Sequence, residues 1–253
     1  MKEVAIRILS APIGRTHLFF LGQAGFVLKS SKGTTLGIDL YLTDCVERYD
    51  GFKRLMPHLL LPQEVEFDYL VATHAHYDHF DVDAVPLMLA NPKTRMFASM
   101  RCAQEAERLH LEPSKLDYVC VGDRRVAGDI RLSFIFCDHG ESAPDALGLM
   151  IEIDGKILYI AGDTCLRLDK VDGILAGRKI DVMIAPINGA FGNLNEAEAV
   201  ALCRTIKPRL MIPCHYWNFA EHHGDPGLFM QLIQEQFPGQ RYVLMPPGER
   251  IDL

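Results

Sequence analysis

Residues 69–81 read Tyr-Leu-Val-Ala-Thr-His-Ala-His-Tyr-Asp-His-Phe-Asp, an apolar run followed at once by three histidines and an aspartate. The run is short and nearly continuously apolar, which predicts a buried strand over residues 67–73. Beyond the histidines, Asp81 or Asp83 can cap a helix whose first turn accepts Pro86. We therefore expect the histidines on the loop between a buried strand and a helix, where no hydrophobic core requires them.

The spacing of the polar residues in this loop indicates metal chemistry. In an extended chain, residues i and i+2 project to the same side, so His74 and His76 can hold one metal ion. Asp78 and His79, at the turn into the helix, can face a second ion. Imidazole and carboxylate groups are ligands that zinc and its neighbours accept. A single histidine is usually structural, but four ligand-type residues behind one strand predict a metal site.

The length and charge of the chain limit the classes of protein to consider. With 253 residues the chain can bury a sizeable core, and because it contains no linker-like stretch we expect one domain spanning residues 1–253. The formal net charge is -7 and no run of Lys or Arg is present, which argues against a nucleic-acid partner. No stretch reaches the roughly 18 apolar residues of a membrane span. We therefore expect a small-molecule substrate, phosphorylated or not, and no membrane partner.

Cysteine usage indicates the compartment. The seven cysteines are widely spaced, odd in number and without a Cys-x-x-Cys pair, which is typical of reduced thiols. Residues 1–14 show no secretory cleavage pattern. We expect a cytoplasmic protein, whose oligomeric state the sequence leaves open, a homo-oligomer included.

Strand and helix patterns alternate along the chain, as in layered α/β folds. Residues 17–28 and 34–42 are rich in β-forming residues and are joined by a turn-rich segment, which predicts a hairpin. Gln23 and Asp39 lie in these segments and are interpreted as bend or turn residues. Further strands are expected at 95–99, 119–121, 130–137, 147–153, 156–161, 181–185, 209–213 and 241–245, and helices at 82–89, 101–109, 195–206 and 228–237.

Three later strand ends each carry one ligand-type residue. His139, Asp163 and His215 all follow apolar strands and could converge at one edge of a sheet, although each alone has a structural explanation. The pair His222-His223 lies in a polar loop containing Gly and Pro and is interpreted as surface.

Together these motifs resemble a known family. The His-x-His-x-Asp-His loop followed by single His, Asp and His residues at later strand ends is similar to the metallo-β-lactamase fold hydrolases, over nearly the whole chain. Within that superfamily, the segments Phe20-Leu-Gly-Gln-Ala-Gly-Phe26, Ile38-Asp-Leu-Tyr41, Pro186-Ile-Asn-Gly189 and His215-Tyr-Trp-Asn-Phe219 resemble the branch that contains ascorbate-6-phosphate lactonase.

The resemblance implies an α/β fold, a four-layer αββα sandwich with the site at one edge between two sheets. It also implies two divalent metal ions, with zinc and manganese as the first candidates and iron as the third. The ligands that it implies are His74, His76 and His139 for one ion, Asp78, His79 and His215 for the other, and Asp163 between them.

The activity expected on this basis is hydrolysis by a metal-bridging hydroxide, in the form of opening a sugar-phosphate lactone. Two cations about 3.5–4 Å apart can lower the pKa of a shared water to near 7, and Asp78 would orient that water or take its proton. Tyr216, Trp217 and Asn218 follow a ligand directly and could line the substrate pocket, although Trp217 could instead serve hydrophobic packing.

Three other functions remain to be compared with lactone hydrolysis. A small-molecule phosphodiesterase of the same fold is the enzymatic alternative, and a non-catalytic metal-binding or regulatory protein is the alternative of another class. Di-iron flavoproteins also use this fold, but they have Glu where His76 stands, and no flavin domain follows here. Cys137, Cys165 and Cys214 lie near proposed ligands, where they could supply thiolate ligands or remain buried inert thiols.

Overall fold

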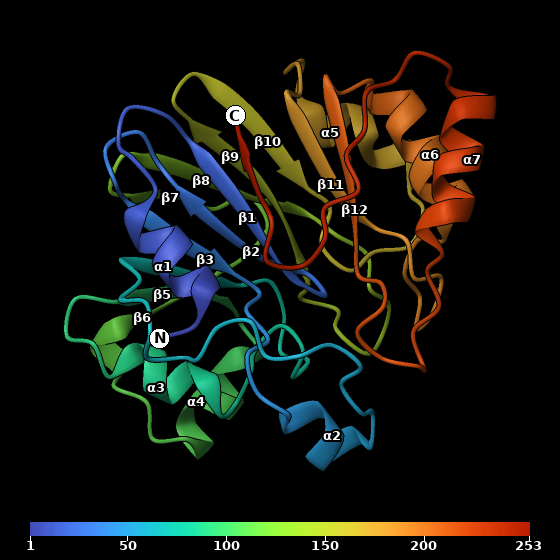
Figure 1. The fold of residues 1–253 in the computed structure, drawn as a ribbon. Coiled ribbons are helices and arrows are strands. Elements are labelled where there is room, and N and C mark those ends of the chain that lie inside the picture. The colour runs from blue at the N-terminus through green and yellow to red at the C-terminus, as the bar shows by residue number, and fades with distance from the viewer.

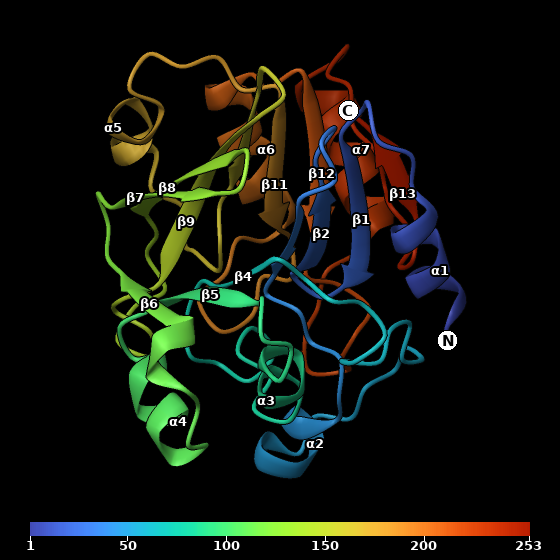
Figure 2. The same ribbon diagram turned by 90° about the vertical axis from the view of Figure 1, so that its left-hand side faces the viewer.

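The structure is a computed structural model that describes residues 1–253 and consists of two β-sheets packed face to face with helices on both outer sides (Figures 1 and 2). The first sheet has the strand order β13-β1-β2-β3-β4-β5-β6. Its strands are β1 (His17–Gly22), β2 (Gly25–Lys29), β3 (Thr35–Ile38), β4 (Tyr69–Ala72), β5 (Arg95–Ser99), β6 (Leu116–Val119) and β13 (Arg250–Asp252). The second sheet has the order β12-β11-β10-β9-β8-β7. Its strands are β7 (Arg124–Ala127), β8 (Ile130–Phe136), β9 (Leu147–Ile153), β10 (Lys156–Ile160), β11 (Val182–Pro186) and β12 (Leu210–Cys214).

The helices form the two outer layers. They are α1 (Glu3–Ser10), α2 (Cys45–Asp50), α3 (Ala84–Leu89), α4 (Cys102–Arg108), α5 (Val171–Leu175), α6 (Glu196–Ile206) and α7 (Pro226–Gln236), with short 3-10 helices η1 (Pro113–Lys115) and η2 (Leu168–Lys170). Figure 2 shows α3 and α4 on the side of β4, β5 and β6, and α6 and α7 behind β11 and β12. The expected αββα architecture is therefore confirmed.

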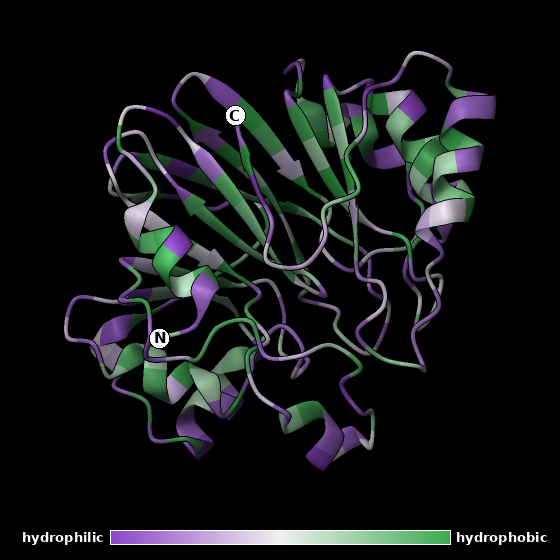
Figure 3. Cartoon of the chain, in the orientation of Figure 1, coloured by the Kyte–Doolittle hydropathy of each residue, from purple (hydrophilic) through white to green (hydrophobic).

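The side chains of strand β1 belong alternately to two hydrophobic cores. Successive side chains of a strand point to opposite faces of the sheet. Accordingly Leu18 and Phe20 belong to the core between the two sheets, whereas Phe19 and Leu21 belong to the core between the first sheet and its helices. Both faces are buried, which explains why residues 18–21 of β1 are continuously apolar instead of alternating (Figure 3).

Strand direction brings several loops to the same edge. Strands β3 and β4 run parallel, and so do β10, β11 and β12. Strand β8 has the direction of β10 because both are antiparallel to β9. The loops that follow β4, β8, β10 and β12 therefore leave their sheets at corresponding edges, and each of these loops carries proposed metal ligands.

The loop after β4 is held by the carboxylate of Asp81. Its Oδ1 accepts hydrogen bonds from the backbone N–H groups of Asp83 (3.1 Å) and Ala84 (3.0 Å) at the start of α3. Its Oδ2 accepts from the N–H groups of Leu42 and Thr43, both at 2.8 Å. Of the two candidate capping residues it is therefore Asp81 that satisfies the first N–H groups of the helix, and it also ties the histidine loop to the segment after β3.

Three strand predictions were wrong in detail. Of the segment 119–121, only Val119 belongs to a strand, as the last residue of β6. The segment 17–28 forms two strands, because Gln23 adopts φ 55° and reverses the chain between β1 and β2. Residues 241–245 form no regular strand, since only Tyr242 makes an isolated bridge, to Met211. The following Pro-Pro pair cannot donate backbone hydrogen bonds, and the chain instead closes the first sheet with β13, antiparallel to β1.

No helix of the structure is both long enough and apolar enough to cross a bilayer.

Candidate metal centre

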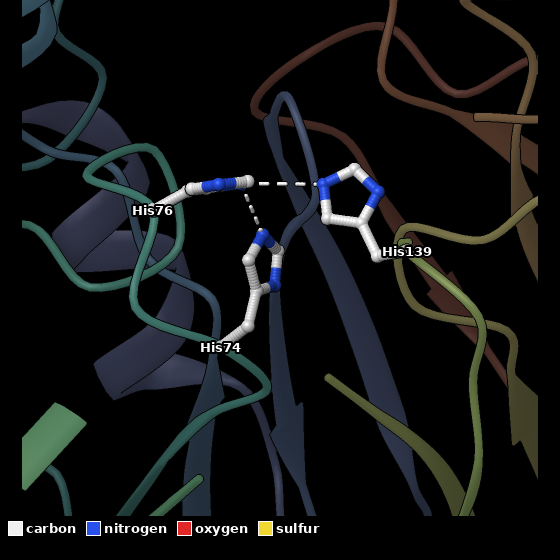
Figure 4. Close-up of side chains that lie close together, drawn as sticks. All are labelled: His74, His76 and His139. Carbon is white, nitrogen blue, oxygen red and sulfur yellow. Dashed lines mark hydrogen bonds between the residues drawn. The ribbon is translucent and has the colours of Figure 1, made fainter. Parts of the chain in front are cut away.

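Three histidines from two loops meet edge to face at the sheet edge (Figure 4). His74 Nε2 lies 2.9 Å from His76 Nδ1, and His139 Nε2 lies 3.2 Å from the same His76 atom. A neutral imidazole has one N–H and one lone pair, so three nitrogens facing one point cannot all be satisfied by one another. These three side chains could hold a metal ion.

A second group lies beside the first and contains the other expected ligands. His215 Nε2 lies 3.1 Å from Asp163 Oδ2 and 3.4 Å from Asp78 Oδ2. His79 Nε2 lies 3.3 Å from Asp163 Oδ2 and 3.7 Å from Asp78 Oδ2. This His79 nitrogen is buried and has no hydrogen-bond partner, and an orphaned imidazole nitrogen that faces two carboxylates fits a metal ligand.

Asp163 connects the two groups. Its Oδ2 is within 3.9 Å of His139 Nε2 in the first group as well as close to both histidines of the second. Asn193 donates a hydrogen bond from Nδ2 to the same oxygen at 2.7 Å and fixes the orientation of the carboxylate. Gly162 precedes Asp163 at φ 71°, and a Cβ atom there would lie 2.6 Å from the carbonyl oxygen of Leu147. Glycine is therefore required for the chain to place Asp163 between the groups.

Asp39 supports the ligands from behind, a role that its sequence context did not reveal. Its carboxylate accepts hydrogen bonds from Thr73 N (2.8 Å), Thr73 Oγ1 (2.7 Å) and His79 Nδ1 (2.9 Å). Because Nδ1 of His79 donates to Asp39, the neutral form of that ring has its lone pair on Nε2, which faces the second group. Carboxylate partners of this kind fix the tautomer and orientation of metal-ligating histidines.

Three residues of this region have left-handed backbone conformations although none is glycine. They are Gln23 (φ 55°), Asp39 (φ 47°) and His215 (φ 63°). Such conformations cost about 1–2 kcal/mol each, and they persist where surrounding contacts enforce them. One such contact is the hydrogen bond from His215 N to Gln23 O, at 2.7 Å.

Burial controls protonation in the first group. It lowers the pKa of His74 well below the ordinary histidine value and lowers the pKa of His76 and His139 in the same direction. These imidazoles are therefore neutral near pH 7, which is the form that binds a metal.

Charge pairing controls protonation in the second group. Burial favours the neutral form of all four side chains, but the mutual attraction of carboxylates and imidazoliums outweighs it. The pKa values of Asp78 and Asp163 are held well below the usual range of a carboxyl group. The pKa of His79 is raised well above the ordinary histidine value, and the pKa of His215 is raised to about 9. Metal ligation needs deprotonated imidazoles, so a cation would replace these protons.

A cavity of about 740 Å³ opens onto both groups. Its wall consists of aromatic and polar side chains beside the ligands; the lining residues are Val46, Asp50, Phe52, Ala75, His76, Tyr77, Asp78, Arg101, Gln104, Glu105, His139, Ser142, Asp163, Phe191, Asn193, His215, Phe219 and His222. His222, which the polar loop favoured as a surface residue, thus faces the cavity, whereas His223 is exposed as expected. Burial lowers the pKa of His222 to about 4.

The three residues expected to line the pocket after His215 do not contact this cavity. Tyr216 is buried and donates its hydroxyl to the carbonyl oxygen of Met245. Trp217 is 54% exposed and lies at a separate shallow groove. The Asn218 side chain is buried elsewhere. In this segment the residue that reaches the cavity is Phe219, one position further along.

The cysteines near the proposed ligands do not belong to the ligand groups. Cys137 donates its thiol to the backbone carbonyl of Asp163 (3.0 Å), and no cysteine belongs to any of the three His and Asp groups that could hold an ion. Burial raises the pKa of Cys137 and Cys214 well above that of a free thiol, and it also raises the pKa of Cys165. The inert-thiol interpretation therefore agrees with the geometry better than thiolate ligation.

Comparison with known proteins agrees with this geometry. A family model described as the beta-lactamase superfamily domain matches residues 17–215, the span that contains all seven expected ligands. The chain belongs to the beta-lactamase superfamily. A UPF0173 metal-dependent hydrolase of Saccharolobus solfataricus is 30% identical over 74% of this chain and 81% of its own length. Another from Pyrococcus abyssi is 26% identical over 92% of this chain and 98% of its own.

Solved structures of the superfamily share the fold. Igni18, described as a novel metallo hydrolase of Ignicoccus hospitalis, superimposes with a TM-score of 0.76 at 21% identity, over 94% of this chain and 98% of that one. An isothiocyanate hydrolase from Delia radicum gut bacteria superimposes with a TM-score of 0.71 at 19% identity, over 93% and 98% of the two chains.

Proposed function

We propose that this chain is a metal-dependent hydrolase of small molecules that uses two divalent cations. One ion is held by His74, His76 and His139. The other is held by Asp78, His79 and His215, and Asp163 lies between the two. The observation that carries the proposal is the direct approach of these side chains, with ligand-type atoms 2.9–3.9 Å apart and the buried Nε2 of His79 left without another partner.

In the proposed hydrolysis the metal ions and the protein side chains have different roles. Bound divalent cations lower the pKa of water to near 7 and polarise the bond under attack. The chain supplies Asp78, which lines the cavity and whose Oδ2 accepts a hydrogen bond from Gln23 Nε2 at 2.7 Å. In this position Asp78 can orient the attacking water and accept its proton. The imidazole and carboxylate donors suit zinc or manganese, and iron as a third candidate.

The cavity wall suggests the substrate class. Phe52 lies 5.7 Å from Phe191 and 6.2 Å from Phe219 between ring centroids, so the three form an aromatic wall beside the second ligand group. Arg101 is the only Lys or Arg in the lining, and its Nε is 3.9 Å from Asp145. We infer that the substrate is a small ester or lactone with an apolar arm, and that a phosphorylated lactone of the type used by the ascorbate-6-phosphate lactonase branch is the second choice.

The test is hydrolysis by the purified protein before chelation, after chelation and after return of zinc or manganese. The substrates are an alkyl-substituted lactone, a sugar-phosphate lactone, bis(p-nitrophenyl) phosphate and an aryl isothiocyanate, the last because of the name of one structural neighbour. We expect about two ions per chain and metal-dependent opening of the alkyl lactone. Cleavage of the phosphodiester alone would assign the phosphodiesterase alternative. Absence of metal after reconstitution would refute the metal centre, and two bound ions without turnover of any substrate would favour a non-catalytic role.

A further inference from the structure

Two adjacent histidines of one loop have different environments. His223 is exposed, whereas His222 is partly buried and stacks on His215, with ring centroids 4.9 Å apart and planes inclined by 14°. The family model ends at residue 215, so His222 lies outside the matched segment. His222 therefore contacts a proposed ligand although it lies outside the matched segment.

Gln23 marks the point where three potential ligands meet. Its Nε2 lies 2.7 Å from Asp78 Oδ2, 3.2 Å from His215 Nε2 and 3.0 Å from His222 Nδ1. An amide nitrogen is only a donor, so Asp78 Oδ2 and His222 Nδ1 face it as acceptors, and His215 Nε2 lies beside the same atom. A cation shared by the three side chains would meet the same three atoms.

The separations are compatible with a shared ion. The ligand atoms of Asp78, His215 and His222 all lie within 4.8 Å of one another. Imidazole nitrogen and carboxylate oxygen bind zinc at about 2.0–2.2 Å, so the ligand atoms of a tetrahedral site stand about 3.3–3.6 Å apart. An inward movement of less than about 1 Å brings the three into coordination distance.

The surroundings hold the His222 ring in place. Phe219, Phe191 and Phe52 surround it at ring-centroid distances of 5.1, 5.3 and 6.0 Å. Packing against aromatic rings restricts the side chain to few orientations and leaves Nδ1 directed at Gln23. A ligand fixed in this way loses little conformational entropy on binding.

The backbone of the loop is anchored as well. Gly224 adopts φ 86°, and a Cβ atom there would lie 2.9 Å from Tyr216 Cβ and 3.3 Å from Asn188 Cα. One residue later, the N–H of Asp225 donates to Glu196 Oε1 at 2.6 Å. The loop therefore packs directly on the end of the strand that precedes His215.

We propose that His222 is a further ligand of the second metal ion, through Nδ1, beside Asp78, His79 and His215. This inference rests on the two-ion function proposed above. A third imidazole makes the second ion richer in nitrogen donors, which favours zinc over manganese at that position.

The experiment compares metal binding by chelator-treated wild type and three variants. His222→Ala removes the ligand, His222→Phe keeps a ring of similar shape in the aromatic cage without a ligand nitrogen, and His223→Ala is the matched control one residue away. Zinc is titrated by calorimetry, the number of ions is measured by mass spectrometry of the metals, and the Co²⁺-loaded proteins are compared by their visible absorption. Circular dichroism and the melting temperature of the metal-free proteins verify folding.

We expect wild type and His223→Ala to bind two ions. Both His222 variants should retain one tight ion and bind the second at least about 100-fold more weakly, since even indirect partners of ligands contribute 10–100-fold. The Co²⁺ spectrum should change in both His222 variants and should stay unchanged in His223→Ala. Equal affinities and spectra in His222→Phe and His223→Ala would overturn the inference while leaving the two-ion hydrolase intact. A wild type that binds fewer than two ions would overturn both.

Discussion

Replacement of Asp39 by Asn tests whether the metal centre depends on the carboxylate behind it. Asn tolerates the left-handed backbone of this position, so the change alters chemistry more than backbone strain. The carboxylate accepts three hydrogen bonds, two from Thr73 and one from His79 Nδ1. The amide retains one acceptor oxygen and turns an NH₂ group toward the remaining donors.

The expected losses of folding free energy and metal affinity follow from the hydrogen bonds that these donors lose. At least one buried donor is left without an acceptor, which costs about 1–3 kcal/mol of folding free energy. If the new NH₂ group faces His79 Nδ1, the ring must carry its proton on Nε2, the atom that faces the second ion. We therefore expect the affinity of the second ion to fall about 10–100-fold, or about 1.4–2.7 kcal/mol.

The assay is calorimetric titration of the metal-free protein with zinc, combined with urea denaturation. Asp252→Asn provides the control, because Asp252 also pairs with a buried histidine, His17, at 2.7 Å from its Nδ1, but lies on β13. The control should lose stability and keep both metal affinities. Equal metal affinities in Asp39→Asn and wild type would refute the idea that Asp39 sets the tautomer of His79.

Three further predictions concern protons, substrate and backbone. Metal affinity should rise from pH 7 through pH 9, because the pKa of His215 is raised to about 9 and that of His79 is raised as well, so a proton must leave each ring before the metal binds; titration in two buffers of different ionisation enthalpy should detect the released protons, and a flat profile would contradict the assignment. Phe191→Ala should raise the KM for an alkyl lactone about tenfold, for loss of about 1.4 kcal/mol of apolar contact, and should leave the KM for an unsubstituted lactone unchanged, compared at equal metal content because Phe191 also packs against His222; equal effects on the two substrates would contradict the apolar arm. Gly224→Ala should lower the free energy of unfolding in urea by more than Gly51→Ala does. Both residues have positive φ, but a Cβ atom meets neighbours only at Gly224. Equal losses would show that the close packing of this loop does not contribute to the free energy of unfolding.

The seven candidate ligands could be singled out from the sequence because they lie in loops that follow apolar strands, and the resemblance to a known family grouped them around two ions. His139, Asp163 and His215 follow β8, β10 and β12, which run in the same direction within one sheet, whereas His74 follows β4 of the other sheet, so its approach to His139 depends on how the two sheets pack. The position of a ligand relative to its strand is thus a local feature with a long-range consequence. The alternation of strands and helices predicted a layered α/β fold, and the αββα sandwich was expected from the resemblance to the metallo-β-lactamase fold hydrolases.

The supporting residues could not be found in the same way. Asp39 and Gln23 were interpreted as turn residues, which is correct for the backbone, since both have positive φ. Their second role depends on which side chains lie across the gap between the sheets, and no periodicity encodes that. Trp217 was expected at the pocket or in hydrophobic packing because it follows His215 closely in sequence, but its left-handed backbone (φ 62°) accompanies a side chain that is 54% exposed and does not line the cavity at the ligands.

The cluster of non-glycine residues at positive φ connects these observations. Gln23, Asp39 and His215 each give up local backbone preference, at about 1–2 kcal/mol apiece, and each has polar contacts in the second ligand group. Departures from local preference are expected at functional sites, where other interactions offset their cost. In the metal-free chain those interactions are the hydrogen bonds of Asp39 and the ion pairs around Asp163. The second ligand group, more than the three histidines of the first, is therefore the part of the centre for which the fold gives up stability.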